Sequence, residues 1–181
     1  FVLLQATNSA SVAVMSLFVT AQLKLPVIWA GVTLGVAALL EIPALWAIAR
    51  ISTRISAPPL IVSGCVAGAL YYALMAVIRD PVSLIAAQVL NAWSFGIVAG
   101  IGMTLFQQLI PRPGLATGLF MNTRKVGAIV SGGIIAIAAI PAFGYPGVFL
   151  ACAILTVVAL VVVEVARRMN RVRGAEAVAP T

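Results

Sequence analysis

The sequence predicts an all-α integral membrane protein with six transmembrane helices. Of its 181 residues, 63% are hydrophobic and 8% are charged, and the mean hydropathy is +1.18. Soluble domains contain roughly 25% charged residues, so this composition excludes an ordinary soluble domain. The high hydrophobicity also excludes a disordered chain. Because the apolar residues are gathered into six long stretches, a membrane protein is the interpretation that fits both composition and pattern.

Each apolar stretch is long enough to cross a bilayer, whose core of about 30 Å needs about 20 helical residues. The stretches are residues 1–20, 29–49, 60–78, 82–106, 115–137 and 148–165. Turns rich in proline or charge separate them, and none alternates between polar and apolar residues as a barrel strand does. Since every backbone group must be satisfied inside lipid, we expect a helical bundle. The chain opens at Phe1 without a methionine or a charged leader, so we expect it to be part of a longer protein.

Basic residues are distributed unevenly between the two ends of the predicted bundle. Lys24 and Arg79 fall at one end, and the other end receives Arg50, Arg54, Arg112, Arg167, Arg168, Arg171 and Arg173. The positive-inside rule places the second end, and with it both termini, in the cytoplasm. We therefore expect a transmembrane bundle at 1–166 and a cytoplasmic basic tail at 167–181. This topology accounts for the net charge of +7, with the lipid bilayer rather than a nucleic acid as the partner.

The residues needed for metal or acid–base chemistry are scarce. The chain has no histidine, and its two cysteines, Cys65 and Cys152, lie inside apolar stretches. They form neither a disulfide framework nor a metal motif. Without an acid pair or a serine dyad, an intramembrane enzyme is not expected, and we predict no cofactor and no metal.

An internal repeat appears when the sequence is shifted by 83 residues. Gln5-x-x-Asn8 then falls on Gln88-x-x-Asn91, Gly31-x-x-x-Gly35 on Gly114-x-x-x-Gly118, and Glu41 on Arg124. Each copy has three helices, an odd number, so the two copies cross the membrane in opposite directions. Inverted repeats of this kind are typical of secondary transporters, which bind substrates near the midplane between the repeats.

Glu41 and Arg124 are the charged residues that we expect near the middle of the bilayer. A rise of about 1.5 Å per residue places each about 15–18 Å from an end of its helix. A charge there costs at least about 2.5 kcal/mol, so such a residue usually faces an interior or a wet cavity. Glu41 is interpreted as a carboxylate that binds a proton or a sugar hydroxyl, with Arg124 facing the same cavity. The alternative is a permanent ion pair of Glu41 with Arg124 or Lys125.

Six further polar side chains are candidate ligands on the wall of a central cavity: Gln5, Asn8, Gln88, Asn91, Trp93 and Asn122. Amides both donate and accept hydrogen bonds, and an aromatic ring covers the apolar face of a sugar. The alternative role of each is a bond between helices, worth about 0.6 kcal/mol on average. Four glycine pairs are predicted to be close-packing faces: Gly31/Gly35, Gly64/Gly68, Gly96/Gly100 and Gly114/Gly118.

Several segments resemble the bacterial sugar efflux transporters of the major facilitator superfamily. They are LEIPA at 40–44, NAWSFGIVAGIGM at 91–103, Phe106-Gln107, Pro111, Gly114, Ala116-Thr117, Leu119-Phe120 and Asn122. The resemblance covers the chain up to the tail and aligns it with helices seven to twelve of that twelve-helix fold. It implies half of a major facilitator fold, whose partner is the N-terminal six-helix half of the same transporter. It further implies proton-coupled sugar export across the bacterial cytoplasmic membrane by alternating access.

Two other functions remain open at this point. A drug/proton antiporter of the same superfamily would have its diagnostic motif in the other half. A six-helix substrate-binding subunit of an ATP-driven importer has a similar length, although the resemblance and the missing methionine argue against it.

Overall fold

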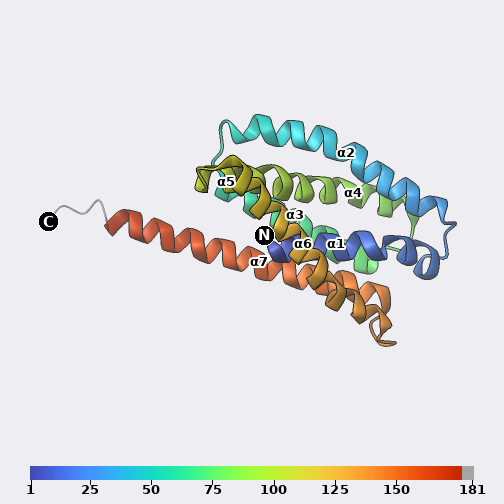
Figure 1. The fold of residues 1–181 in the computed structure, drawn as a ribbon. Helices are drawn as coiled ribbons and strands as arrows, with labels where there is room; N and C mark the ends of the chain where they lie inside the picture. Colours follow the sequence, from blue (N-terminus) through green and yellow to red (C-terminus); the bar gives the residue numbers. More distant parts are fainter. Residues whose placement is uncertain (177–181) are drawn as a thin grey trace.

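The computed structural model of this protein is a bundle of helices (Figure 1). It describes the backbone of residues 1–176 and the side chains of residues 1–169. The elements are α1 (Val2–Leu17), η1 (Phe18–Gln22), α2 (Ile28–Ser52), α3 (Ala57–Val77), α4 (Pro81–Gly96), η2 (Ile97–Ile101), α5 (Gly102–Leu109), α6 (Pro113–Ile135), η3 (Ala136–Ala139) and α7 (Gly144–Glu176). Because η1 extends α1, η2 joins α4 to α5, and η3 extends α6, the described residues form six continuous helical segments without a strand. The predicted all-α class is confirmed.

Five of the six segments are long and apolar enough to cross a membrane: Val2–Gln22, Ile28–Ser52, Ala57–Val77, Pro81–Leu109 and Gly144–Met169. The remaining segment contains α6, whose 23 residues extend over about 35 Å at 1.5 Å per residue. Its length is therefore sufficient, but the run Asn122-Thr123-Arg124-Lys125 makes it more polar than the others. The segment that does not meet the criteria for a membrane span is thus the one that carries the predicted mid-membrane base.

Proline residues mark where three helices begin. Pro58, Pro81 and Pro113 each occupy one of the first two positions of α3, α4 and α6. Proline suits these positions because it lacks the N–H that would be unpaired there and its φ is already helical. At α4, Oδ1 of Asp80 also accepts a hydrogen bond from the backbone N–H of Ser83 at 2.8 Å. This bond to the charged form lowers the pKa of the Asp80 carboxyl below its ordinary value.

The helices pack in the pattern that the predicted repeat requires. α1 packs against α6 and α7, α4 packs against α2 and α3, and α3 packs against α7. Exchanging α1 with α4, α2 with α6 and α3 with α7 reproduces the same set of contacts. When 83 is added to the residue numbers of the first three helical segments, most of their first and last residues fall within a few residues of those of the last three segments. The packing therefore supports two inverted three-helix units.

Two apolar clusters hold α3 and α7 behind α1 and α4. The first contains Phe18, Tyr71 and Phe149, and the rings of Phe18 and Phe149 meet edge to face with their centroids 4.9 Å apart. The second contains Cys65 of α3, Ala159 of α7 and Ile97 of η2. The many van der Waals contacts of these buried side chains stabilise the interior of the bundle.

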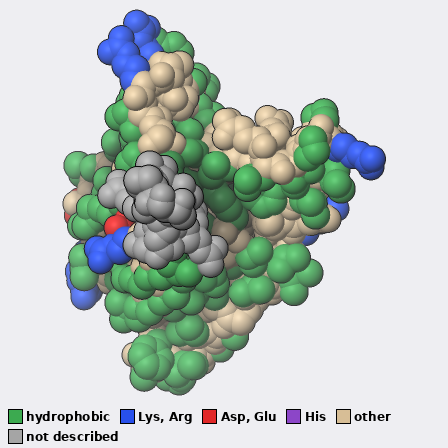
Figure 2. Space-filling model, turned by 90° about the vertical axis from the view of Figure 1, so that its left-hand side faces the viewer, with side chains coloured by type: hydrophobic (Ala, Val, Ile, Leu, Met, Phe, Trp, Pro, Cys, Tyr) green, Lys and Arg blue, Asp and Glu red, His purple; other side chains and the backbone are tan. Residues whose placement is uncertain are grey.

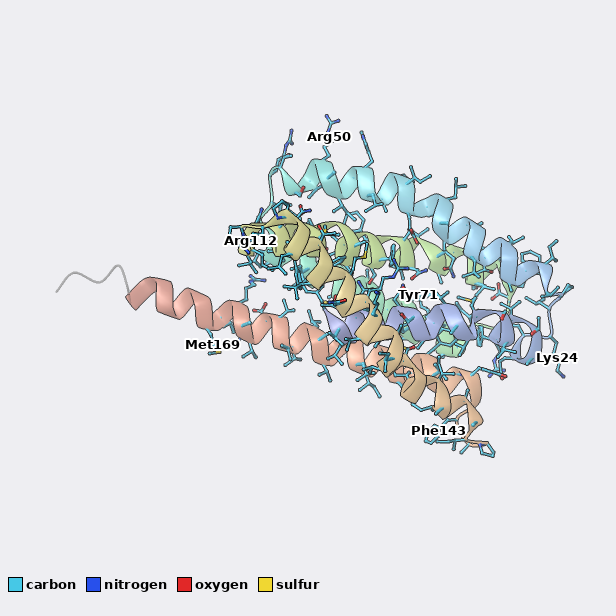
Figure 3. All side chains as sticks on the ribbon, in the orientation of Figure 1. Lys24, Arg50, Tyr71, Arg112, Phe143 and Met169 are labelled. Carbon is cyan, nitrogen blue, oxygen red and sulfur yellow. The ribbon has the colours of Figure 1, made fainter. Side chains whose placement is uncertain are left out.

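The turns alternate between the two ends of the bundle. Arg50, Arg112 and Met169 lie at one end, and Lys24 and Phe143 lie at the other (Figure 3). The first end also holds Arg54, Arg167 and Arg168, and Arg79 lies beside Gln22 and Leu23 at the other end. The basic residues with described side chains that lie outside the apolar stretches are therefore distributed between the two ends as the sequence predicts. A view from this end shows mostly hydrophobic side chains, with basic side chains at the margins (Figure 2).

Helix α7 extends beyond its predicted apolar stretch as far as Glu176. The expected tail at 167–181 is therefore helical over residues 167–176. The side chains of Arg171 and Arg173 and the residues 177–181 lie outside the described part of the chain.

Candidate functional site

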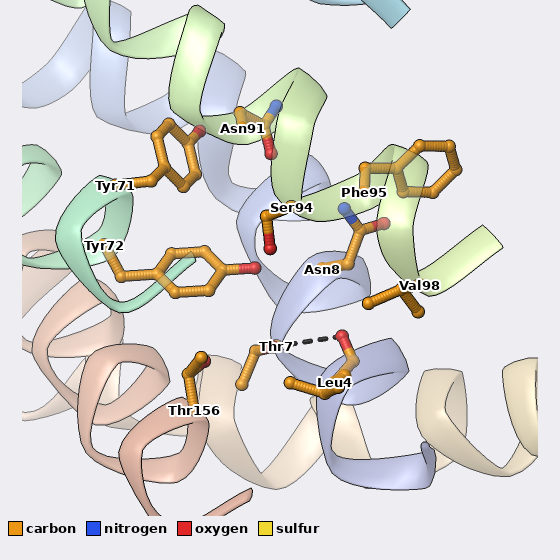
Figure 4. A pocket seen from close by; sticks show the side chains of 10 residues that line it. All are labelled: Leu4, Thr7, Asn8, Tyr71, Tyr72, Asn91, Ser94, Phe95, Val98 and Thr156. Atoms are coloured by element: carbon orange, nitrogen blue, oxygen red, sulfur yellow. Dashed lines mark hydrogen bonds between the residues drawn. The ribbon is translucent and has the colours of Figure 1, made fainter. Parts of the chain in front are cut away.

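A small polar space, which we call the polar notch, lies between α1 and α4 (Figure 4). Its walls come from α1 and from α4 with η2, and its floor comes from α3 and α7. Its volume is about 10 Å³, close to the space that one water molecule needs. The lining residues are Leu4, Thr7, Asn8, Tyr71, Tyr72, Asn91, Ser94, Phe95, Val98 and Thr156.

The polar notch brings together two predicted ligands that are 83 residues apart in the sequence. Asn8 on α1 and Asn91 on α4 both line it, and both are half-buried. They occupy equivalent positions in the two repeats. Ser94 follows Asn91 by nearly one turn and lies on the same face. The arrangement places amide and hydroxyl groups of both repeats at one site.

The two predicted glutamines lie inside the bundle instead of lining the polar notch. Nε2 of Gln88 donates to the carbonyl oxygen of Leu84 at 3.1 Å, and its Oε1 accepts from Nδ2 of Asn91 at 3.1 Å. Gln5 is also buried and lies where α1 closely approaches Gly127 of α6. Gln88 therefore orients Asn91, while Gln5 occupies a helix interface.

Trp93 does not line the polar notch. Its Nε1–H donates to Oγ of Ser63 on α3 at 3.3 Å, and its ring packs against the apolar cluster that contains Ile97. This contact is a hydrogen bond between helices, which is the alternative role of this residue given above. A role of Trp93 in ligand binding stays a prediction.

The predicted charged pair is divided between the two helices that flank α1 and α4. Glu41 is half-buried on α2, whereas Asn122, Arg124 and Lys125 are exposed on α6. Arg124 is the charged side chain that acts electrostatically on Glu41. Within the described residues, however, neither base of α6 comes within 4.0 Å of the Glu41 carboxylate as a salt bridge. The permanent ion pair is therefore not the arrangement found in this structure.

The four predicted glycine pairs fall into two groups. In the first, Gly64, Gly68, Gly96 and Gly100 lie against side chains of neighbouring helices. In the second, an added Cβ would meet no described atom within 4 Å; these residues are Gly31, Gly35, Gly114 and Gly118. We call the second group the open glycine faces of α2 and α6. They occupy equivalent positions in the two repeats.

Five polar residues of the polar notch are not among the six ligands predicted from the sequence: Thr7, Tyr71, Tyr72, Ser94 and Thr156. The Tyr71 hydroxyl lies 3.4 Å from Oγ of Ser11, and Oγ1 of Thr156 donates to the carbonyl oxygen of Cys152 at 2.8 Å. Two adjacent tyrosines in an apolar stretch were an available signal, because a buried phenol usually finds a partner. Thr156 carries no such signal, since threonine commonly bonds to the backbone of its own helix.

Metal-binding geometry is absent from the part of the chain that the structure describes, where no three His, Cys, Asp or Glu side chains are grouped to hold an ion. Cys65 and Cys152 are buried and free. The polar notch instead offers neutral hydroxyl and amide groups, which suit a ligand that both donates and accepts hydrogen bonds.

Known proteins resemble this chain over most of its length. A model of the MFS_1 like family matches residues 1–145. Sugar efflux transporter B of Salmonella typhimurium is 38% identical over 138 residues, which are 76% of this chain and 35% of the relative. Sugar efflux transporter A of Dickeya chrysanthemi is 36% identical over 126 residues, 69% of this chain and 32% of the relative. Sugar efflux transporter A of Escherichia coli is 36% identical over 159 residues, 87% of this chain and 40% of the relative.

The matched region is a limited part of each relative. The chain spans about a third to two fifths of the length of these curated proteins. No solved structure matches the chain significantly.

Proposed function

The chain belongs to the MFS_1 like family, and we propose that it is the C-terminal six-helix half of a secondary transporter that exports sugars or sugar analogues. The observation that carries this proposal is the identity of 36% to 38% with three sugar efflux transporters over most of the chain. These relatives are named as transporters, in agreement with the expectation that the chain is not an enzyme. The resemblance seen in the sequence is thereby confirmed.

The polar notch is the part of this chain best suited to contact a sugar. Asn8 and Asn91 carry amides that donate and accept, and Ser94 adds a hydroxyl. Phe95 presents a half-buried ring beside them, and an aromatic face covers the C–H groups of a sugar. A neutral, polyhydroxylated ligand matches this set better than an ion does.

The open glycine faces of α2 and α6 are the proposed contact with an N-terminal six-helix half. Gly31, Gly35, Gly114 and Gly118 leave open space at the helix surface, and small residues let helix backbones approach closely in membranes. Because α2 and α6 flank α1 and α4, a second bundle that packs on these faces would close a cavity over the polar notch. Rocking of the two bundles would then alternate access to that cavity.

Proton coupling is assigned to Glu41, with Arg124 as its electrostatic partner. The two lie on opposite flanks of α1 and α4, and Arg124 acts on Glu41 without a direct ion pair. A relative movement of α2 and α6 would change their separation and hence the proton affinity of the carboxylate. Proton binding and release would thus follow the transport cycle.

The basic end of the bundle is assigned to the cytoplasm of a bacterial inner membrane. Arg50, Arg54, Arg112, Arg167 and Arg168 lie at that end, against Lys24 and Arg79 at the other. The positive-inside rule then orients both ends of the chain toward the cytoplasm.

The direct test measures release of a labelled monosaccharide and a labelled disaccharide from proteoliposomes that contain the complete transporter. We expect saturable sugar release, and about a tenfold higher half-saturating concentration for Asn8→Ala or Asn91→Ala, because tenfold corresponds to about 1.4 kcal/mol. Ser16→Ala is the control, since Ser16 is exposed on α1 and does not line the polar notch. Export of hydrophobic cations without any sugar would identify a drug/proton antiporter instead.

A further inference from the structure

The floor of the polar notch is formed by helices outside the pair that supplies its walls. Tyr72 of α3 is only 5% exposed, and Thr156 of α7 only 1%. In Figure 4 the side chains of Tyr72, Ser94 and Asn8 point into the space between α1 and α4. The deepest polar groups that a ligand would meet therefore include a phenol from α3.

Most polar groups around the floor are already paired. Oγ1 of Thr7 donates to the carbonyl oxygen of Leu4 at 3.0 Å. Thr156 is bonded to the backbone of its own helix, and the amide nitrogen of Asn91 is bonded to Gln88. The hydroxyls of Tyr72 and Ser94 form no hydrogen bond of good geometry with another described residue, although the Tyr72 hydroxyl faces Thr7.

The hydroxyls of Tyr72 and Ser94 retain some solvent-accessible surface in the notch. In the described part of the chain, no side-chain nitrogen or oxygen is both fully buried and without a partner. Because neither the Tyr72 nor the Ser94 hydroxyl has a hydrogen bond of good geometry, neither hydroxyl is fully enclosed. The notch volume of about 10 Å³ admits a group the size of one water molecule, which is also the size of one sugar hydroxyl.

Gly68 makes the position of the Ser94 hydroxyl possible. A Cβ at Gly68 would lie 2.6 Å from Oγ of Ser94 and 3.5 Å from Cγ2 of Thr156. Any larger residue at position 68 would push the Ser94 hydroxyl out of its place beside the floor. The backbone of α3 thus supports Ser94 in addition to providing Tyr72.

We propose that the polar notch is a subsite for a single hydroxyl group of the transported sugar, held by the hydroxyls of Tyr72 and Ser94. The inference rests on the proposed function as a sugar exporter. A sugar hydroxyl donates one hydrogen bond and accepts others, and both protein hydroxyls do the same. A bound sugar that lacks this hydroxyl would cover both protein hydroxyls without pairing them, so the site discriminates against it. Tyr72 and Ser94 thereby determine specificity at one position of the sugar ring.

The test measures competition by monodeoxy sugars against transport of the labelled parent sugar in the complete transporter. We expect one deoxy analogue to compete at least tenfold more weakly than the parent sugar. Tyr72→Phe and Ser94→Ala should reduce this difference to less than threefold, and Gly68→Ala should act in the same direction by displacing Ser94. Discrimination at the other ring positions should not change in these variants.

The control is Tyr145→Phe, which removes a phenol from the first turn of α7, outside the polar notch, and should keep the full discrimination. Unchanged discrimination in transport-competent Tyr72→Phe and Ser94→Ala proteins would overturn the subsite and leave the notch as a place for a water molecule only. Absence of sugar transport by the unmodified protein would instead reject the proposed function itself. The three variants act through different atoms, so a folding defect in one leaves the others to decide.

Discussion

The indole N–H of Trp93 on α4 donates to the hydroxyl of Ser63 on α3, with 3.3 Å between nitrogen and oxygen. This bond turns the ring away from the polar notch and toward the neighbouring helix. Asn91 and Ser94, which are three residues apart, share the face that lines the notch. Trp93 is two residues from Asn91 and therefore points about 200° around the helix from it.

Loss of this bond is expected to weaken the bundle slightly without affecting sugar affinity. Trp93→Phe keeps most of the ring and Ser63→Ala removes only the acceptor, so each should cost about 0.6 kcal/mol of unfolding free energy. The double variant should be no less stable than the Trp93→Phe variant, because the shared bond is lost only once. Thermal unfolding and the half-saturating sugar concentration check this. A large rise in that concentration for Trp93→Phe alone would restore the ligand role predicted from the sequence.

A close approach of α1 and α6 makes Gly127 sensitive to substitution. An added Cβ would lie 2.7 Å from Cβ of Gln5 and 2.9 Å from the backbone nitrogen of Ala6. Because a backbone atom cannot move aside, Gly127→Ala should destabilise the protein by about 1–3 kcal/mol. Gly132→Ala in the same helix meets no atom within 4 Å and serves as the matched control. Equal thermal stability of the two variants would contradict the observed helix contact.

The helices could be predicted well because their signals are local. Apolar length identifies each span, and Asp80 with Pro81 marks the start of α4. Helix α7 is the exception, since it runs well beyond the apolar stretch at 148–165. Glu164 forms ion pairs with Arg167 and Arg168 at 3.2 Å, and such pairs support a helix where hydropathy no longer does.

The candidate site could be predicted only in part, because neighbouring helices decide which face of a helix is open. The repeat relates Asn8 to Asn91, and both side chains line the polar notch. The same repeat relates Gln5 to Gln88, but both are buried inside the bundle. The adjacent tyrosines indicate buried phenols, but only the packing of α3 places the Tyr72 side chain at the notch.

The cap of α4 predicts a dependence of stability on pH. Accepting the Ser83 N–H lowers the pKa of Asp80 in the folded protein, so the folded state favours the ionised carboxylate. Its contribution is therefore fully present above the unfolded pKa of about 3.9 and is lost as the pH falls through the lower folded value. Asp80→Asn, which still caps but carries no charge, should be less stable than the unmodified protein at neutral pH. Thermal unfolding in detergent should show this difference shrinking in acid, and a constant difference would contradict the assignment.

The open glycine faces predict how the two proposed halves associate. Gly35→Leu and Gly118→Leu place large side chains in space that is empty in this chain, so they should weaken copurification of the two halves expressed as separate polypeptides. Ala73→Leu is the control, because Ala73 is exposed on α3 and outside these faces. Copurification that survives both glycine variants would place the second bundle elsewhere. We also expect this chain alone to show no sugar flux in proteoliposomes, since alternating access needs two bundles.

A substitution of Glu41 distinguishes a role in proton-coupled sugar efflux from a role in the stability of the fold. In the complete transporter, Glu41→Gln keeps the size of the side chain but cannot exchange a proton, so it should abolish efflux driven by a pH gradient. Sugar binding and counterflow exchange should persist, because neither requires net proton movement.

A buried ion pair of Glu41 with Arg124 would behave differently. Loss of one partner would cost about 3–5 kcal/mol of stability, and Glu41→Gln combined with Arg124→Gln would regain part of it. The absence of a salt bridge at Glu41 among the described residues argues against this second outcome. Glu164→Gln is the matched control, since its carboxylate pairs with Arg167 and Arg168 near the basic end and contributes at most about 1 kcal/mol there. Normal gradient-driven efflux by a well-folded Glu41→Gln protein would remove Glu41 from the coupling mechanism.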